Sequence, residues 1–247
     1  MKYLICFCVF ILFTLTAFAQ QLHVAVAANA QFVANKLKEA FKKETGIDAE
    51  LTTSSSGKLT AQIEQGAPFN VFLSADMKYP EELYSKGLTT NKPQVYAYGT
   101  LVLWTLKNIN LTNDLSILSN RNVQKIAIAN PKLAPYGKAA MQVLTKQNLL
   151  LGVQQKVVYG ESIAQVNQYL LSGAADVAFT AKSVVLDSAV SNKGKWIEVS
   201  PKWYNPIAQG VVIIRQSDAK QMTAANKFYQ FLFSKKAKDI FIKYGYR

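Results

Sequence analysis

Short apolar runs alternate along the chain with segments whose apolar residues recur at helical spacing. The apolar run from Leu22 to Ala27 is followed by a stripe from Phe32 to Phe41 that stops at Thr45-Gly46. The run predicts a buried strand, and the stripe predicts an amphipathic helix closed by glycine. By the same patterns, strands are expected at 47–52, 71–73, 98–106, 125–129, 157–159, 177–180 and 210–215. Helices are expected around 59–63 and at 81–86, 138–148, 163–171 and 219–244.

This alternation of strands and helices predicts an α/β fold whose sheets are mainly parallel and flanked by helices. The pattern runs through two halves of the chain, which we expect to form separate lobes. Residues 20–99 and 207–247 are assigned to lobe 1 and residues 100–206 to lobe 2, with crossing segments near 98–100 and 206–209. In such sheets ligands bind beyond the carboxyl ends of the strands, so the loops there are the candidate site.

Residues 1–19 have the organisation of a secretory signal peptide. Lys2 precedes an apolar run from Leu4 to Phe18, which ends in Ala17-Phe18-Ala19. A charged start, an apolar core and a small-x-small end are typical of a cleaved leader, and the run is short for a membrane span. Both cysteines, Cys6 and Cys8, lie inside it. We therefore expect an exported, soluble protein that has neither a disulfide nor a catalytic cysteine.

The charge of the chain is strongly basic. The formal net charge is +13, or +12 without Lys2, and the sequence pI is about 9.6. A basic surface is compatible with nucleic acid, an anionic membrane or anionic solutes. The lysines are spread along the chain and only three arginines are present. We therefore expect no nucleic-acid partner.

Four loops between a strand and a helix are small or polar, namely 27–30, 55–57, 134–137 and 159–163. The first N–H groups of a helix lack an intrahelical partner and lie at the positive end of the helix dipole. If the four helix starts converge, these groups can hold an oxyanion together with the side chains of Asn29, Ser56 and Tyr136. Taken singly, Asn29 and the serines are explained as well by helix capping, and Tyr136 as an aromatic residue beside a turn.

Several stretches, in order over the whole chain after residue 19, carry a family resemblance. They are Val26-Ala27-Ala28-Asn29, Ser54-Ser55-Ser56-Gly57-Lys58-Leu59, Gln62-Ile63-Glu64-Gln65-Gly66-Ala67-Pro68, Val71-Phe72-Leu73-Ser74-Ala75-Asp76, Ala129-Asn130-Pro131, Ala134-Pro135-Tyr136-Gly137 and Phe241 to Tyr246. With them the chain resembles the periplasmic molybdate-binding proteins of ABC-type molybdate transporters. The resemblance implies a two-lobed, type II-like periplasmic binding protein with its ligand cleft between the lobes.

The resemblance also implies which residues hold the anion. The family's site falls on Asn29, Ser56, Tyr136 and Ile163. The first two would donate through backbone and side chain, and the last two through a backbone N–H. Some relatives carry a ligand-binding tyrosine where this chain has Ala181. The phenol of Tyr136 is a candidate replacement for that donor, so Tyr136→Phe is expected to weaken molybdate binding.

The function implied by the resemblance is capture of molybdate or tungstate in the periplasm for an ABC importer. Its implied partner is the membrane permease, the protein is expected to be a monomer, and molybdenum enters only as the bound oxyanion, without a cofactor. The lobes would close on the anion by hinge motion. Discrimination against sulfate would depend on cavity size, because these anions are all tetrahedral dianions.

Other functions are weighed against this one. An enzyme is the main alternative class, and a binding protein for another tetrahedral oxyanion, such as sulfate, is the alternative that keeps the fold. Catalysis has little support, because His23 lies in a predicted strand and no hydrolase or phosphate-loop motif is present. Asp76 and Glu161 are the most suggestive carboxylates. We expect the first to organise the loop after its strand and the second to lie at a helix N-terminus.

Overall fold

The computed structural model of the chain describes residues 21–216 and 218–247, and its strands form two separate five-stranded sheets. The expected signal peptide at 1–19 lies outside the described residues. The first sheet has the order β2-β1-β3-β10-β4 and the second β7-β6-β8-β5-β9. The first comprises β1 (Leu22–Ala27), β2 (Ala49–Ser54), β3 (Val71–Leu73), β4 (Gln94–Gly99) and β10 (Ile207–Ile213). The second comprises β5 (Leu101–Thr105), β6 (Ile126–Ala129), β7 (Val157–Gly160), β8 (Val177–Ala181) and β9 (Lys195–Glu198).

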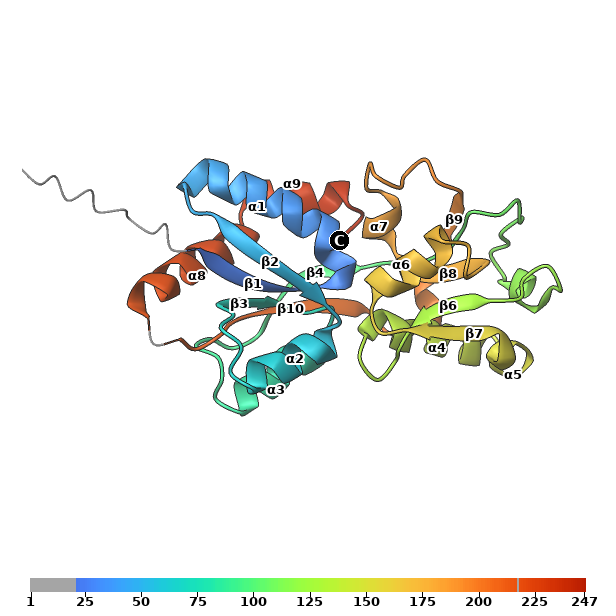
Figure 1. Ribbon diagram of the computed structural model, residues 1–247, viewed down its shortest axis with the longest axis horizontal. Helices are drawn as coiled ribbons and strands as arrows, with labels where there is room; N and C mark the ends of the chain where they lie inside the picture. The colour runs from blue at the N-terminus through green and yellow to red at the C-terminus, as the bar shows by residue number, and fades with distance from the viewer. Residues whose placement is uncertain (1–20, 217) are drawn as a thin grey trace, which may run out of the picture.

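Both sheets are mixed, which corrects the expectation that they are mainly parallel. In the first sheet β1 pairs in parallel with β2 and β3, whereas β10 is antiparallel to β3 and β4. The second sheet repeats the arrangement, with β6 parallel to β7 and β8, and β5 antiparallel to β8 and β9. Every antiparallel pair includes β5 or β10, each of which is the first strand after the chain crosses between the sheets. The α/β class and the two lobes are confirmed (Figure 1).

The helices cover the sheets of their own lobes (Figure 1). The helices of lobe 1 are α1 (Gln31–Thr45), α2 (Ser56–Glu64), α3 (Lys78–Ser85), α8 (Ala219–Leu232) and α9 (Lys235–Lys243), with a 3₁₀ turn at Ala28–Ala30. The helices of lobe 2 are α4 (Pro135–Lys146), α5 (Leu150–Val153), α6 (Ile163–Leu171) and α7 (Lys182–Val185), with 3₁₀ turns at Ser116–Ser119, Gln154–Lys156 and Pro201–Trp203. Gly46 ends α1 in the left-handed region, at φ 73°, where a residue without a Cβ is favoured.

The first sheet is buried on both faces, which explains the continuous apolar run of β1. Val24 and Val26 pack with α1, α8 and α9, where the Phe41 and Phe228 rings meet edge to face at 5.1 Å. Ala25, which points to the opposite face, packs with residues of α2 and α3. A strand covered on both sides needs apolar residues at every position rather than at alternate ones.

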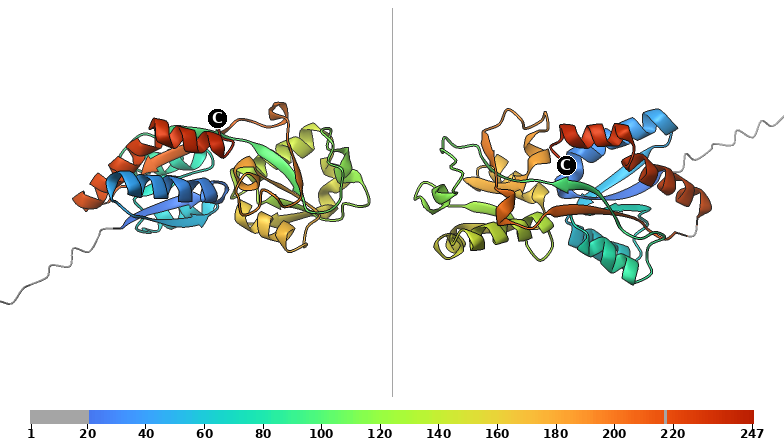
Figure 2. Two further views of the ribbon diagram at one scale, coloured as in Figure 1. Left: turned by 90° about the horizontal axis from the view of Figure 1, so that it is seen from above. Right: turned by 180° about the vertical axis from the view of Figure 1, so that it is seen from behind.

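The chain crosses between lobes where one long strand was expected at 98–106. The structure has two strands there, β4 and β5, and they belong to different sheets. β5 is buried throughout, whereas β4 is buried only in part and exposes Tyr98 just before the break at Thr100. The chain returns through the segment that leads into β10, and Figure 2 shows both crossings between the lobes.

Two further elements differ from the expectation. The long helix expected at 219–244 is divided into α8 and α9, because Ser234 begins a new helix and its hydroxyl accepts the N–H of Ala237 at 3.2 Å. The edge strand β9 was not expected. Its sequence, Lys-Trp-Ile-Glu, is half polar and is paired on one side by β5.

Candidate functional site

A small cavity lies between the lobes, at the carboxyl ends of strands from both sheets. Its volume is about 10 Å³, which is close to the space that one water molecule needs. None of its lining residues carries a charge. The lining residues are Ala27, Ala28, Asn29, Ser55, Ser56, Ala75, Ala134, Pro135, Tyr136 and Ile163. They include all four site residues expected from the sequence, Asn29, Ser56, Tyr136 and Ile163.

Each of the four residues lies at the start of a helix. Asn29 is in the 3₁₀ turn before α1, Ser56 and Ile163 are the first residues of α2 and α6, and Tyr136 follows the proline that begins α4. Backbone N–H groups at these positions have no intrahelical acceptor. Among the described residues no acceptor is found for the N–H of any of the four. Four hydrogen-bond donors, two from each lobe, therefore meet around one cavity that contains no side-chain cation.

The hydroxyl of Ser56 is also oriented as a donor. Its Oγ accepts the N–H of Ala75 at 3.0 Å, which leaves the hydroxyl proton for another acceptor. The neighbouring Ser55 is the N-cap of α2, and its Oγ accepts the N–H of Lys58 at 3.4 Å. Ser54 is the last residue of β2 and does not line the cavity. The three serines thus have three different roles.

The side chain of Asn29 is held by the protein itself. Its Nδ2 donates to Gln209 Oε1 at 2.9 Å and to Tyr246 Oη at 3.2 Å, so both amide hydrogens have partners. The backbone carbonyl oxygen of Asn29 accepts a hydrogen bond from the hydroxyl of Ser183, in lobe 2, at 2.6 Å. The donor that Asn29 offers to the cavity in this structure is therefore its backbone N–H, rather than backbone and side chain together.

The phenol of Tyr136 points toward the crossing segments. Its Oη accepts a hydrogen bond from Nε2 of Gln209 at 3.3 Å. A Cβ placed on Gly99 would lie 2.0 Å from this Oη. Neither Gln209 nor Gly99 lines the cavity. Burial raises the pKa of the Tyr136 phenol well above its usual value, so the group stays protonated. Its use as a replacement for the donor absent at Ala181 stays a prediction.

The two lobes are closed over the cavity. The Gly57 N–H donates to the Leu133 carbonyl across the cleft at 3.0 Å, and Lys58 forms an ion pair with Glu161. A Cβ on Gly57 would lie 3.2 Å from the backbone of Leu133. The glycine therefore allows a close approach of the opposite lobe. On the other side of the cavity the Tyr244 hydroxyl reaches Asp187 Oδ2 at 3.0 Å.

The remaining titratable candidates have structural partners. Asp76 Oδ1 accepts the Ser74 hydroxyl at 3.3 Å and the Tyr79 N–H at 3.4 Å, which confirms that it organises the loop after β3. The His23 imidazole lies 3.3 Å from Glu50 on the neighbouring strand. Within residues 21–216 and 218–247 there is no cluster of three or more His, Cys, Asp and Glu residues that could hold a metal ion.

Three residues that contact the site were not expected from the sequence: Ser183, Gln209 and Tyr246. All are buried and lie 154 to 217 residues from Asn29 along the chain. A glutamine within the otherwise apolar run of β10 is the one local signal that could have indicated a buried polar contact. The C-terminal end of the chain lies between the lobes in Figure 1, which brings Tyr246 to the site.

Tyr246 makes an alkaline stability prediction possible. Burial raises the pKa of its phenol from 10 to about 12. The unfolded chain thus loses this proton before the folded one, so the stabilisation is complete below pH 10 and is lost as pH rises toward 12. The shift corresponds to about 3 kcal/mol. In urea unfolding between pH 9 and 12, we expect the unmodified protein to lose more stability than Tyr246→Phe by this amount. Equal losses in the two proteins would contradict the assignment.

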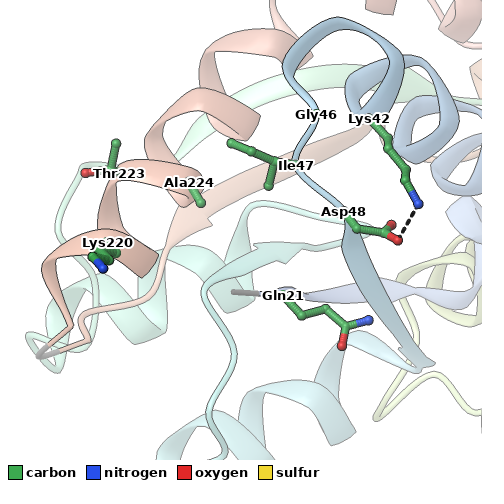
Figure 3. Close-up of a pocket in the computed structure, with 8 residues that line it drawn as sticks. All are labelled: Gln21, Lys42, Gly46, Ile47, Asp48, Lys220, Thr223 and Ala224. Atoms are coloured by element: carbon green, nitrogen blue, oxygen red, sulfur yellow. Dashed lines mark hydrogen bonds and ion pairs between the residues drawn. The ribbon is translucent and has the colours of Figure 1, made fainter. Parts of the chain in front are cut away.

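A larger cavity, of about 610 Å³, lies at the opposite end of lobe 1, near the start of β2 (Figure 3). Lys42 and Asp48 point toward each other at its wall and form an ion pair at 2.7 Å. Lys38 also approaches Asp48, at 3.6 Å, and these lysines hold the pKa of that carboxyl below its usual value. None of the four site residues borders this cavity.

Comparison with known proteins extends over nearly the whole chain. Residues 22–247 match the model of a family described as bacterial extracellular solute-binding protein. The molybdate-binding protein ModA of Azotobacter vinelandii is 37% identical over 92% of this chain and 90% of its own length. ModA of Rhodobacter capsulatus is 34% identical over 94% and 90%. The solved structure of the Azotobacter vinelandii periplasmic molybdate-binding protein superimposes with a TM-score of 0.86 at 36% identity, covering 92% of this chain and 98% of that one.

No helix in the described part of the chain has the length and apolar content needed to cross a bilayer.

Proposed function

Because the chain belongs to the bacterial extracellular solute-binding protein family, we propose that it captures molybdate, and also tungstate, between its lobes and delivers it to an ABC importer. The observation that carries the proposal is the convergence of four free N–H groups, at Asn29, Ser56, Tyr136 and Ile163, on one cavity without a cation. Its chemical identity as a molybdate site is supported by relatives named molybdate-binding proteins at 34% and 37% identity.

The donor set suits a fully deprotonated tetrahedral anion. Backbone N–H groups and the Ser56 hydroxyl surround the cavity, and fixed dipoles at helix starts stabilise a dianion there without a counter-charge. A monoprotonated phosphate would need an acceptor for its own hydroxyl, and no carboxylate lines the cavity. Sulfate has the same shape and charge as molybdate, so the size of the closed cavity has to distinguish them.

The proposal includes the setting of the protein. It acts outside the cytoplasm as a monomer, with a cleaved leader at 1–19, and its macromolecular partner is a membrane permease rather than nucleic acid. It uses no cofactor and catalyses no reaction. The closed lobes would present the loaded form to the permease, and opening would release the anion.

Calorimetric titration of the ligand-free protein with molybdate, tungstate, sulfate and phosphate tests this function. We expect molybdate and tungstate to bind, sulfate to bind at least a hundredfold more weakly, and phosphate to give no heat of binding. Sulfate binding as tight as molybdate binding would overturn the named ligand while leaving the oxyanion site. Failure of all four anions to bind would overturn the site itself.

A further inference from the structure

Gln209 is a fully buried polar side chain in the strand that returns from lobe 2 to lobe 1. Its exposed fraction is 0%, and the residues around it in β10 are largely apolar. A buried amide is costly unless its donors and acceptors have partners. Its Oε1 accepts from Asn29 Nδ2 at 2.9 Å and from the Tyr96 hydroxyl at 2.7 Å. Its Nε2 donates to the Tyr136 hydroxyl at 3.3 Å.

These partners come from both lobes and from the anion site. Asn29 and Tyr96 belong to the first sheet and its helices, whereas Tyr136 lies on α4 of lobe 2. Asn29 and Tyr136 both line the cavity. One side chain therefore contacts a helix start of each lobe, from a position on the crossing strand itself.

Gly99, on the other crossing segment, leaves the room for this contact. A Cβ built there would lie 2.0 Å from Tyr136 Oη and 2.6 Å from Gln209 Nε2. The phenol of lobe 2 thus fills the space where any other residue would have a side chain. Movement of lobe 2 about the crossing segments would withdraw Tyr136 from this space and break its bond to Gln209.

We propose that Gln209 is a positioning residue that couples lobe closure to anion binding, by joining Asn29 of lobe 1 to Tyr136 of lobe 2. The inference rests on the proposed function, since it concerns the same site. When the lobes close, Nε2 of Gln209 donates to the Tyr136 hydroxyl while its Oε1 accepts from Asn29 Nδ2. The two helix starts are then fixed at one separation, so the closed form holds their N–H groups in one arrangement around the anion.

A double-mutant cycle between Gln209→Met and Tyr136→Phe tests the coupling, with molybdate affinity as one readout. Each single change is expected to weaken binding roughly tenfold. Their combination should be no weaker than the worse single variant, because either change already breaks the bridge. Effects that multiply to roughly a hundredfold would overturn the inference and would favour direct contact of the phenol with the anion. Unchanged affinity in Gln209→Met would also overturn it.

Lobe closure is the second readout, and a purely structural role would not change it. Residues 20–247 contain no cysteine, so single cysteines at the exposed Gln62 and Gln168 can carry a pair of fluorophores across the cleft. Molybdate should shorten the distance between them in the unmodified protein. At equal occupancy, Gln209→Met and Tyr136→Phe should show a smaller closed fraction. The same closed fraction in all proteins would overturn the inference.

Two variants guard against a folding defect. Gly99→Ala keeps both polar groups and places a methyl group in their contact, so it should also weaken binding and closure. Tyr204→Phe is the matched control, because the Tyr204 phenol is buried near the same crossing and accepts the Leu101 N–H at 3.1 Å without touching Gln209. It should leave affinity and closure unchanged. Loss of binding by the unmodified protein would be a failure of the proposed function, whereas normal binding with unaffected Gln209 and Gly99 variants would be a failure of the inference alone.

Discussion

Replacing Ile163 by proline is expected to weaken molybdate binding roughly a hundredfold while leaving the fold in place. The substitution removes one backbone N–H, and a hydrogen bond to a charged group contributes about 1.5–3 kcal/mol. A tenfold change in affinity corresponds to about 1.4 kcal/mol. The proline ring also occupies the position from which the N–H points at the cavity. Both effects act on the anion directly.

The backbone at this position is already suited to proline. Ile163 is the first residue of α6, where proline is favoured because no intrahelical bond is lost. The preceding Ser162 is extended, at φ −150° and ψ 169°, as a residue before proline must be. The helix should therefore form as before, which circular dichroism and thermal unfolding can verify.

Ile163→Ala is the matched control. Ile163 is 3% exposed, so proline also removes buried apolar surface that packs in the lobe 2 core. Alanine removes a similar part of the side chain and keeps the N–H. We expect the alanine variant to be less stable but to bind molybdate nearly as tightly as the unmodified protein in calorimetry. If proline and alanine variants bind equally well, the Ile163 N–H is not part of the site.

The helix starts at the site could be predicted from sequence because their signals are local. Strand β1 and helix α6 have the expected bounds, and α1 ends at the expected glycine. Residues next to the ends of buried strands have few places to lie other than the edge of the sheet. Local signals were therefore enough to find the four loops, whereas the family resemblance implied that Asn29, Ser56, Tyr136 and Ile163 meet, and all four line one cavity.

The contacts behind the site could not be predicted in this way. Gln209 and Tyr246 reach Asn29 across 180 and 217 residues, and nothing in the local pattern pairs them. The same holds for the break between β4 and β5, because apolar residues on both sides of it do not show that the two strands belong to different sheets. Periodicity reports whether a segment is buried, but not which segment covers it.

Replacing Ser56 by alanine is the second large expected effect, with molybdate binding roughly 10- to 100-fold weaker. The Ser56 hydroxyl accepts the Ala75 N–H at 3.0 Å, so its own proton remains to be donated to the anion. Alanine removes that donor and keeps the backbone N–H. It also leaves the buried N–H of Ala75 without its partner, at a cost of about 1–3 kcal/mol in folding free energy. Calorimetry at a temperature well below the unfolding transition measures the affinity separately from this loss.

Ser54→Ala is the control for the serine run. It makes the same chemical change two residues earlier, at the end of β2 and away from the cavity lining, and should leave the affinity unchanged. Equal weakening by both changes would indicate that the strand end is disturbed rather than that a ligand donor is lost.

Ser56 and Ile163 belong to opposite lobes, which gives the two large effects a common meaning. An anion held by donors from both sides draws the lobes together, because each lobe gains bonds only when the other is in place. With Ser56→Ala, saturating molybdate should still close the lobes, since the backbone N–H groups at positions 56 and 29 of lobe 1 remain. Weak binding without closure at saturation would instead mean that the Ser56 hydroxyl is required to bring the lobes together, and the site would depend on that one donor more than its geometry implies.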